Sequence, residues 1–415
     1  MRDVRMRGFR QRKSVEEAIS LLTSRTGALE GEHVPVTRAA GRVLAEDVAA
    51  PHNVPHFRRS AMDGWAVVAE STFGASSYAP ARLVVIGQAL PGRPFVGSLV
   101  RGQALRITTG APMPAGADAV LMAERGEETQ DGEAVLLVVS DAVSPGKHVG
   151  EVGEDVAAGT LIASRGRKLR PQDAGLLASV GASPVPVVRQ PRVRLVVTGD
   201  ELLAPGLLPE GARIVDSNSV VLAALVARDG GDLAVVVRSV DRYETVREAI
   251  AGGDEDIVLV SGGSSVGPED HAPLALAEIG EVTVHGIAMR PSSPAGFGFV
   301  PGKTRARPVF LLPGNPVSCL CAYEFFAGPT IRAFGGLSRD WPHPRRRGRL
   351  VSKIVSELGR VDYVRVKFTA GDVTPIMTSG ASILSSTTRA DGVVLVPAGS
   401  EGHGEGEEVE VLLYD

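Results

Sequence analysis

Residues 192–199 read RVRLVVTG, a short apolar run that ends at a glycine, and the fold of the chain can be worked out from it. Similar runs recur as LAVVVRSV at 233–240, DIVLVSGG at 256–263 and RPVFLLPG at 307–314. Helical patterns occupy 217–231, 241–250 and 315–334. Strands that alternate with helices are typical of a doubly wound, mainly parallel sheet. We therefore predict an α/β domain built on these four strands.

Capping residues indicate where two of these helices begin. Ser217 or Asn218 is expected to cap the first helix. Asp241 and Glu244 have the spacing of a capping box for the second. This gives Asp241 a structural role that competes with any functional one.

The sequence before this domain does not show the same alternation of strands and helices. Ser14 and Glu17 form a capping box in front of a first helix, and residues 170–182 (RPQDAGLLASVGA) read as another, with Asp173 near its start and Gly181 at its end. Between them, residues 53–143 show strands and turns without a long helical period. We therefore predict a β-rich module there. The basic residues 1–14 lack an apolar core, so they are expected to be a disordered arm and not a secretory signal.

The last part of the chain alternates apolar and polar residues, as in VDYVRVKFTA at 361–370 and EEVEVLLYD at 407–415. This pattern predicts a small antiparallel barrel or sandwich. The preceding stretch WPHPRRRGR at 341–349 is rich in Pro and Arg. We expect a solvated linker or hinge at this stretch.

Composition excludes several classes of protein. The 415 residues carry 44 basic and 48 acidic side chains, a formal net charge of −4, which argues against broad binding to nucleic acid or an anionic membrane. No apolar run approaches the roughly 18 residues that cross a bilayer. The two cysteines, Cys319 and Cys321, are too close in an apolar stretch for a disulfide framework or a zinc site. We expect a cytoplasmic protein.

Polar residues gather where three of the predicted strands end. They are Thr198-Gly-Asp-Glu201, Ser261-Gly-Gly-Ser-Ser-Val-Gly267 with Glu269 to His271 after it, and Leu312-Pro-Gly-Asn-Pro-Val-Ser318. Ligands of a parallel sheet bind at this edge, where glycines, hydroxyls and helix N-termini suit an oxyanion. Glu201 and Asp270 would repel a bare phosphate, so a divalent cation is expected between these carboxylates and the anion. Each motif alone is more often a plain turn or helix start; three at one edge favour a site.

Seven motifs in order resemble one known family. They are SAMDGWA, RITTGAPMPAGADAV, GEDV, VVTGDEL, IVDSNS, VSGGSSVGPED and LPGNPVS, within a match from about Ser14 to the C-terminus. The chain resembles the molybdopterin molybdenumtransferases, which include MoeA-type enzymes and the E domain of gephyrin. The resemblance implies a MogA-like sheet domain at 185–336. It also implies a discontinuous α+β domain at 12–52 and 144–184, a β-rich module at 53–143 and a C-terminal β-barrel at 337–415.

The resemblance implies a reaction as well. Such enzymes take molybdate and adenylylated molybdopterin, cleave the pyrophosphate, release AMP and insert molybdenum, with Mg²⁺ as the usual cation. They work as homodimers, with the site between the sheet domain of one subunit and the β-rich module of the other. Transient contacts with the adenylylating enzyme and with molybdoenzymes follow from this role.

Site residues carry over by position. The functional group comprises Asp63, Thr109, Asp155, Glu201, Asp241 and Asp270, of which Glu201 and Asp270 are expected to face the metal. The residues expected to bind the pterin nucleotide are Ser261, Gly262, Gly263, Ser264, Arg290, Gly314, Asn315 and Pro316. The molybdate pocket of the family matches Pro313, Ser318, Arg360 and Ser382.

Some positions depart from the family. A lysine pair in KPGKP is here Arg290-Pro-Ser-Ser-Pro294, so Ser293 replaces one cation. Arg59 replaces an Asn, and Gly150 stands where Arg is frequent. Arg59 restores the lost charge if it points into the same cleft. The Ser293 change favours an alternative, a paralogue that binds or carries the pterin without inserting metal. A non-enzymatic scaffold is a weaker alternative, because the acidic residues are all present.

Overall fold

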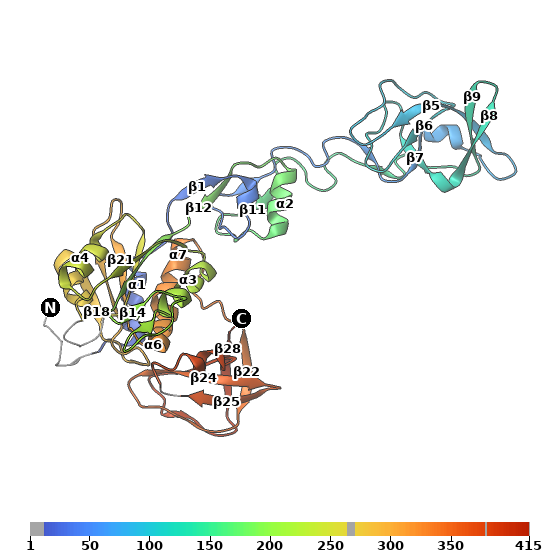
Figure 1. The fold of residues 1–415 in the computed structure, drawn as a ribbon. Helices are drawn as coiled ribbons and strands as arrows, with labels where there is room; N and C mark the ends of the chain where they lie inside the picture. The colour runs from blue at the N-terminus through green and yellow to red at the C-terminus, as the bar shows by residue number, and fades with distance from the viewer. Residues whose placement is uncertain (1–11, 264–269, 378–379, 415) are drawn as a thin grey trace. The chain divides into compact units, whose positions relative to one another are not determined.

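The computed structural model describes residues 12–263, 270–377 and 380–414, and these form two compact units (Figure 1). One unit combines residues 12–33, 41–45 and the described residues from 186 onward, and the other combines 34–40 and 46–185. The first unit holds the predicted sheet and barrel, and the second holds the β-rich module. The finer division into four domains stays a prediction.

The predicted parallel sheet is confirmed. Its strands run in the order β16-β13-β17-β21-β20-β18, in which the first four are parallel, β20 pairs antiparallel with β21, and β18 pairs antiparallel with β20. Their bounds are Arg192–Thr198 (β13), Asp232–Ser239 (β16), Ile257–Ser261 (β17), Glu281–His285 (β18), Gly296–Val300 (β20) and Arg307–Leu312 (β21). Strands β18 and β20 were not predicted. They extend the edge beside β21 and leave the carboxyl ends of the parallel strands on one edge.

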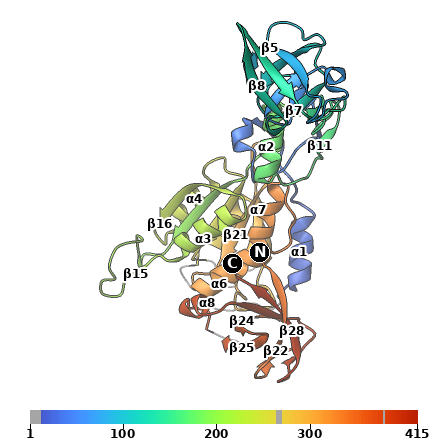
Figure 2. The ribbon, with the colours of Figure 1, turned by 90° about the vertical axis from the view of Figure 1, so that its right-hand side faces the viewer.

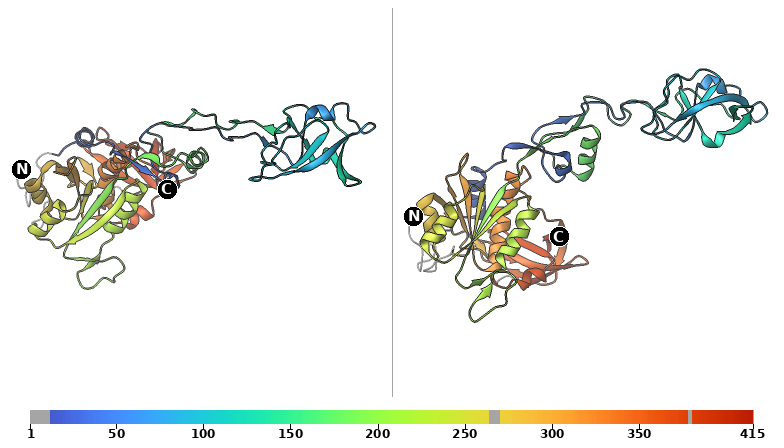
Figure 3. Two further views of the ribbon diagram at one scale, coloured as in Figure 1. Left: turned by 90° about the horizontal axis from the view of Figure 1, so that it is seen from above. Right: turned by 45° about the horizontal axis from the view of Figure 1, so that its top comes forward.

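Helices cover both faces of this sheet (Figure 3). Residues of α1, α3, α6 and α7 share one buried cluster with Leu195, Leu259 and Phe310, whereas α4 and α5 share another with Val196 and Val258. The bounds are Val15–Thr23 (α1), Asn218–Arg228 (α3), Tyr243–Ala251 (α4), Ala272–Ile279 (α5), Pro316–Ala322 (α6) and Gly328–Phe334 (α7). Because helices pack on both faces, the central strands are buried throughout.

One predicted cap is wrong, one is correct in position only, and one is confirmed. Helix α4 begins at Tyr243 with no side-chain cap, and Asp241 instead exchanges backbone-to-carboxylate hydrogen bonds with Asp200. Helix α3 follows Ser217, but the side chain that accepts from its first turn is Asp216, through Ser219 N–H at 2.9 Å. The capping box of Ser14 in front of α1 is present.

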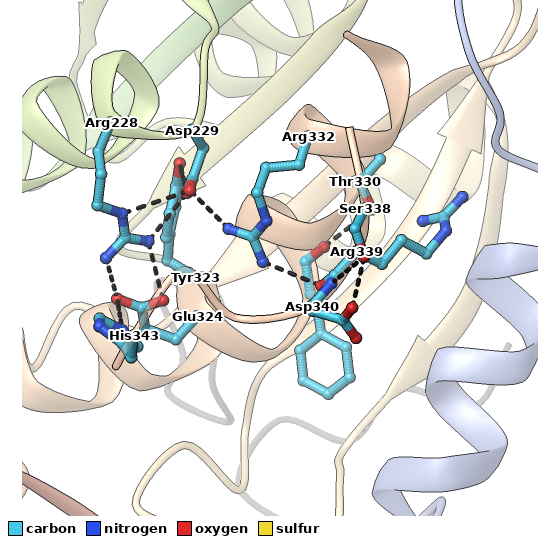
Figure 4. Close-up of polar contacts among 11 residues, drawn as sticks. Arg228, Asp229, Tyr323, Glu324, Thr330, Arg332, Ser338, Arg339, Asp340 and His343 are labelled. Atoms are coloured by element: carbon cyan, nitrogen blue, oxygen red, sulfur yellow. Dashed lines mark hydrogen bonds and ion pairs between the residues drawn. The ribbon is translucent and has the colours of Figure 1, made fainter. Parts of the chain in front are cut away.

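A buried ionic network joins α3 to the long helix that follows β21 (Figure 4). That helix contains a π turn, Tyr323–Ala327, between α6 and α7. Asp229 accepts from Arg332, Arg228 and Tyr323 at 2.5, 2.9 and 2.9 Å, and Arg228 also pairs with Glu324. The predicted helix at 315–334 is thus confirmed, with a π turn that its local pattern did not predict.

The Glu324 carboxylate is the acidic end of this network. His343 lies 3.5 Å from it, and both side chains are buried. Burial alone raises the pKa of Glu324, but the contacts with His343 and Arg228 outweigh it and hold the pKa below its usual value. The carboxylate therefore stays charged within the core.

The C-terminal residues form a closed barrel of five strands, with β24 paired to both β25 and β26 (Figure 2). The strands are Arg345–Leu350 (β22), Val361–Thr369 (β24), Asp372–Met377 (β25), Gly392–Val396 (β26) and Glu408–Leu413 (β28). The barrel is confirmed, although β22 and β25 are parallel. Shorter elements are β14 Leu202–Leu203, β15 Ile214–Val215, β19 Met289–Arg290, β23 Ile354–Val355, β27 Gly402–His403 and α8 Ser385–Thr388.

The predicted linker at 341–349 is wrong. Its arginines form β22, where Arg345 and Arg347 pair with Glu410 and Glu408 of the neighbouring strand. The predicted arm is also wrong at its end, because Lys13 bridges to Ile287. Residues 1–11 lie outside the described residues.

The second unit carries the predicted β-rich module as a six-stranded sheet in the order β7-β4-β6-β5-β9-β8. These strands are Gly64–Val67 (β4), Ala81–Ala89 (β5), Gln103–Ile107 (β6), Ala119–Met122 (β7), Gly126–Asp131 (β8) and Ala134–Val139 (β9). The predicted helix is α2, Pro171–Ser179, with Gly181 after it at φ 70°. Short pairs of this unit are β3 Arg59–Ser60 with β10 Val149–Gly150 and β2 Val48–Ala49 with β11 Leu161–Ala163. A further pair, β1 Gly31–Val34 with β12 Val185–Val188, has most of its residues in the first unit.

Two expectations about the chain as a whole can be compared with the structure. Cys319 and Cys321 are both free and buried, and burial raises the pKa of Cys319 to about 12. None of the helices in the described ranges is long and apolar enough to cross a membrane.

Candidate active site

A cleft of about 610 Å³, here the strand-end cleft, opens at the carboxyl ends of the parallel strands. Predicted site residues on its wall are Glu201, Asp241, Ser261, Gly262, Gly263, Asp270, Gly314, Asn315, Pro316 and Ser382. The sheet topology brings these distant segments together, as the three strand-end motifs predicted. Ser264 lies outside the described residues.

The glycine turn after β17 leaves a polar hollow in this cleft. Gly262 has φ 94°, and a Cβ there would lie 2.5 Å from the carbonyl oxygen of Thr198. The Thr198 hydroxyl is buried, faces the same glycines and has no hydrogen-bond partner among the residues that the structure describes. A hydroxyl donor left in this position suits an oxyanion. Thr198 begins the first of the predicted strand-end motifs, but the sequence assigned no role to its hydroxyl, because a threonine at a strand end is ordinary.

Asn218 ties two strand ends together. Its Nδ2 donates to Ser261 Oγ at 3.1 Å and to the carbonyl oxygen of Gly314 at 2.8 Å. From the sequence, Asn218 is predicted only as a helix cap. The motif IVDSNS was the available signal for a functional position, but it did not indicate what the amide contacts.

Three carboxylates, Glu201, Asp241 and Asp270, line the strand-end cleft. No cluster of three or more His, Cys, Asp or Glu within residues 12–263, 270–377 and 380–414 has the arrangement of a metal site. Mg²⁺ in phosphate-handling sites is commonly held by one or two carboxylates together with substrate phosphates. Glu201 and Asp270 fit that mode of binding, because the cleft offers carboxylate oxygens beside room for a phosphate.

A second cleft of about 430 Å³, here the arginine cleft, shares Gly314 and Asn315 with the first. The predicted residues Arg290, Pro313, Ser318 and Arg360 line it. Ser382, predicted for this pocket, lines the strand-end cleft instead, whereas its neighbour Ala381 lines the arginine cleft.

Several polar atoms of the arginine cleft are buried without a partner. Arg290 Nε, Arg360 Nη2 and Ser293 Oγ have no hydrogen bond within the described part of the chain. The adjoining loop is held tightly, since Ser292 has φ 84° and donates from Oγ to the carbonyl oxygen of Ser318 at 2.5 Å. Partly buried guanidinium groups with unused donors are suited to a small oxyanion.

The remaining predicted acids lie in the second unit. Asp63 Oδ1 accepts from the backbone amide of Thr109 at 2.7 Å and from its hydroxyl at 3.0 Å. These two bonds, the amide first, hold the pKa of the Asp63 carboxyl below its usual value. The structure therefore brings the Asp63 carboxylate and Thr109 into contact. Asp155 is exposed in a turn.

Arg59 lies directly opposite Gly150 in the β3–β10 pair. Its Nη2 is 2.8 Å from Glu154 Oε1, and a Cβ on Gly150 would meet both side chains. The Glu154 carboxylate and the Cγ of Arg59 therefore occupy the space beside Gly150 that a larger residue there would need.

Three family models match successive parts of the chain. The MoeA N-terminal region (domain I and II) matches residues 13–181, a probable molybdopterin binding domain matches 194–333, and the MoeA C-terminal region (domain IV) matches 347–414. Together they span nearly all of the described sequence, in the order expected for one protein of this family.

Curated relatives and solved structures agree with these matches. Molybdopterin molybdenumtransferase 2 of Mycobacterium tuberculosis is 36% identical over 85% of this chain and 87% of its own length. Molybdopterin molybdenumtransferase of Bacillus subtilis is 31% identical over 96% and 93%. A molybdopterin biosynthesis MoeA structure from Pyrococcus horikoshii OT3 has a TM-score of 0.71 at 31% identity, covering 97% of this chain and 100% of that chain. The chain therefore belongs to the MoeA family of molybdopterin molybdenumtransferases, enzymes of molybdenum cofactor biosynthesis.

Proposed function

We propose that this chain inserts molybdenum from molybdate into adenylylated molybdopterin and releases AMP, with dependence on a divalent cation. The observation that carries the proposal is the pair of adjoining clefts, which share Gly314 and Asn315. One cleft is lined by carboxylates and glycines, and the other by partly buried guanidinium groups. Two anionic reactants can therefore be held side by side.

The strand-end cleft is proposed to hold the pyrophosphate of the nucleotide. Glu201 and Asp270 would hold Mg²⁺, which when bound supplies charge neutralisation to the phosphates. The Thr198 hydroxyl donates to a phosphate oxygen, and the glycine turn leaves room for it to approach. The side chain of Asn218 holds Ser261, at the end of β17, and Gly314, just after β21, in fixed positions beside the ligand.

The arginine cleft is proposed to hold molybdate. A tetrahedral dianion needs cations and hydrogen-bond donors, and Arg290 Nε, Arg360 Nη2 and Ser293 Oγ are available. Because this cleft adjoins the strand-end cleft, molybdate would bind beside the dithiolene end of the bound pterin.

Asp63, Thr109 and Asp155 enter the proposal through a homodimer. We propose that the second unit of one subunit completes the strand-end cleft of the other, as in the family that the sequence resembles. The same resemblance supports a cytoplasmic location, Mg²⁺ as the cation, and transient contacts with the adenylylating enzyme and with molybdoenzymes.

The test is AMP release from adenylylated molybdopterin with Mg²⁺, measured with and without molybdate. We expect molybdate-dependent release by the wild type and a loss of about a hundredfold in Glu201→Gln, because the variant lacks one carboxylate charge near the metal. Glu210→Gln is the matched control, since Glu210 is exposed and does not line the cleft. Pterin binding without AMP release by the wild type would contradict the proposal.

A second candidate function is a carrier that binds the pterin without inserting metal. Ser293 favours it, because its buried hydroxyl stands in the arginine cleft where the family commonly has a lysine. A large gain of AMP release in Ser293→Lys would mean that the natural chain is catalytically weakened. Unchanged or lower activity would favour the transferase.

A further inference from the structure

We propose that Asp362 is a positioning residue that aims Arg290 and Arg360 into the arginine cleft and thereby sets its affinity for a tetrahedral oxyanion. The inference rests on the proposed function in taking molybdate as that oxyanion. Asp362 was not among the site residues predicted from the sequence, and it does not line the cleft itself.

The Asp362 carboxylate contacts both arginines. Its Oδ2 accepts from Arg290 Nη2 and, at 2.8 Å, from Ser356 Oγ, while its Oδ1 accepts from Arg360 Nε at 3.1 Å. The side chain is fully buried. A charge in such a place is strongly bound to its partners, because water does not compete for its oxygens.

The backbone places this carboxylate between two parts of the first unit. Asp362 lies in β24 of the barrel, and its register partner in the parallel β19 strand is Arg290, which belongs to the segment between β18 and β20. Arg360 comes from the turn just before β24. One carboxylate thus joins a guanidinium from the sheet domain to one from the barrel.

In each guanidinium group, the nitrogen next to the one that contacts Asp362 is left without a partner. Arg290 Nε and Arg360 Nη2 are buried without a partner in the part of the chain that the structure describes, and both residues line the arginine cleft. Arg360 Nη1 pairs with Glu357 at 2.7 Å, but that carboxylate is 74% exposed and screened by water. Two cations therefore share one buried anion, and an oxyanion in the cleft supplies the missing charge.

Loss of the Asp362 charge removes the common acceptor. Asp362→Asn is nearly isosteric, but its amide nitrogen is a donor and opposes one of the two guanidinium groups. The arginines then repel each other without a fixed geometry. We expect the wall to remain cationic but to lose its orientation toward the oxyanion.

The experiment measures the KM for molybdate and kcat of AMP release for the full-length chain, and molybdate binding alone by calorimetry. In Asp362→Asn, we expect the KM and the dissociation constant for molybdate to rise about tenfold or more, the loss typical of a charged hydrogen bond. The kcat at saturating molybdate and the KM for the nucleotide should stay within about twofold. Glu357→Gln is the matched control, because it removes an exposed carboxylate from the same arginine.

A merely structural role would lower kcat with the folded fraction and leave the molybdate KM unchanged, which would overturn the proposal. If Asp362→Asn does not fold, Ser356→Ala removes the hydroxyl donor from the same carboxylate. An unchanged molybdate affinity in that folded variant would also overturn the proposal, whereas a rise of about threefold would support it.

Failure of the proposed function can be told apart from failure of this inference. If the wild type binds molybdate and releases no AMP, the proposed reaction fails, and calorimetry still decides the role of Asp362. If the wild type releases AMP and Asp362→Asn has the same molybdate affinity, only the inference fails. Absence of molybdate binding by the wild type overturns the inference.

Discussion

Gly262 is the residue at which the strand-end cleft tolerates a side chain least. Its φ is 94°, and an added Cβ would lie 2.5 Å from the backbone oxygen of Thr198. We expect Gly262→Ala to cost about 1–3 kcal/mol of unfolding free energy, since the backbone must move. AMP release should fall with it, because the turn lines the cleft.

Urea denaturation and the AMP assay measure these two effects. Gly399→Ala is the matched control, because a Cβ there meets nothing within 4 Å and the residue has no positive φ. Equal unfolding midpoints for the two variants would show that the Gly262 contact does not constrain the turn.

The contacts of Asp63 predict that the stability of the fold depends on pH. The amide and hydroxyl of Thr109 hold its pKa below the ordinary value of 3.8, so they stabilise the ionised form. A depressed folded-state pKa contributes stability that is present above the unfolded-state pKa and is lost as the pH falls through the folded-state value. We expect Asp63→Asn to lower stability at pH 7 and the difference from wild type to shrink below about pH 4.

Urea midpoints at several pH values from 7 to 3 test this expectation. Thr109→Ser, which keeps both donors, should retain the wild-type profile. A difference that grows toward acid pH would mean that Asp63 is stabilised in its neutral form.

At the scale of elements, one buried carboxylate joins α3 to the helix that contains the π turn. Asp229 is fully buried and accepts from Arg228, Tyr323 and Arg332, so Asp229→Ala leaves buried guanidinium charge without its acceptor (Figure 4). We expect a loss of about 3–5 kcal/mol of unfolding free energy.

Chemical denaturation of the full chain gives the measurement. Glu410→Ala removes an exposed ion pair from the barrel and should cost less than about 1 kcal/mol. Similar losses for the two variants would contradict the importance assigned to the network.

At the scale of the whole molecule, the two units have separate hydrophobic cores. Leu137 and Val139 lie in one buried cluster of the second unit, and Val258 and Val260 lie in a cluster of the first. Because a core substitution acts through the cavity that it leaves, Leu137→Ala should destabilise the second unit by about 2–5 kcal/mol and leave the first unchanged.

Calorimetry of the full-length chain tests whether the units unfold separately. Val260→Ala is the reciprocal variant and should shift the other transition. If both variants move one shared transition by similar amounts, the two units unfold as one cooperative body.

The local sequence determined the repeating strands and helices of the sheet domain. Each strand is a short apolar run and each helix has an apolar face, so the periodicity alone indicates the element. The polar residues at the strand ends followed from the same pattern, because parallel strands place their carboxyl ends on one edge. The kinds of residue that line the strand-end cleft were therefore predictable. The roles of the Thr198 hydroxyl and the Asn218 amide were not.

Tertiary contacts decided what local patterns could not. The arginines of β22 form a strand because acidic residues of β28 lie beside them, and Asp241 is released from capping because Asp200 meets it from another strand end. Asp362 is 72 residues from Arg290, so no window of sequence contains both charges. The sequence by itself determined which elements form and which family they build; only the packing of sheet domain against barrel decided which buried charges share a partner, because that depends on contacts distant in the chain.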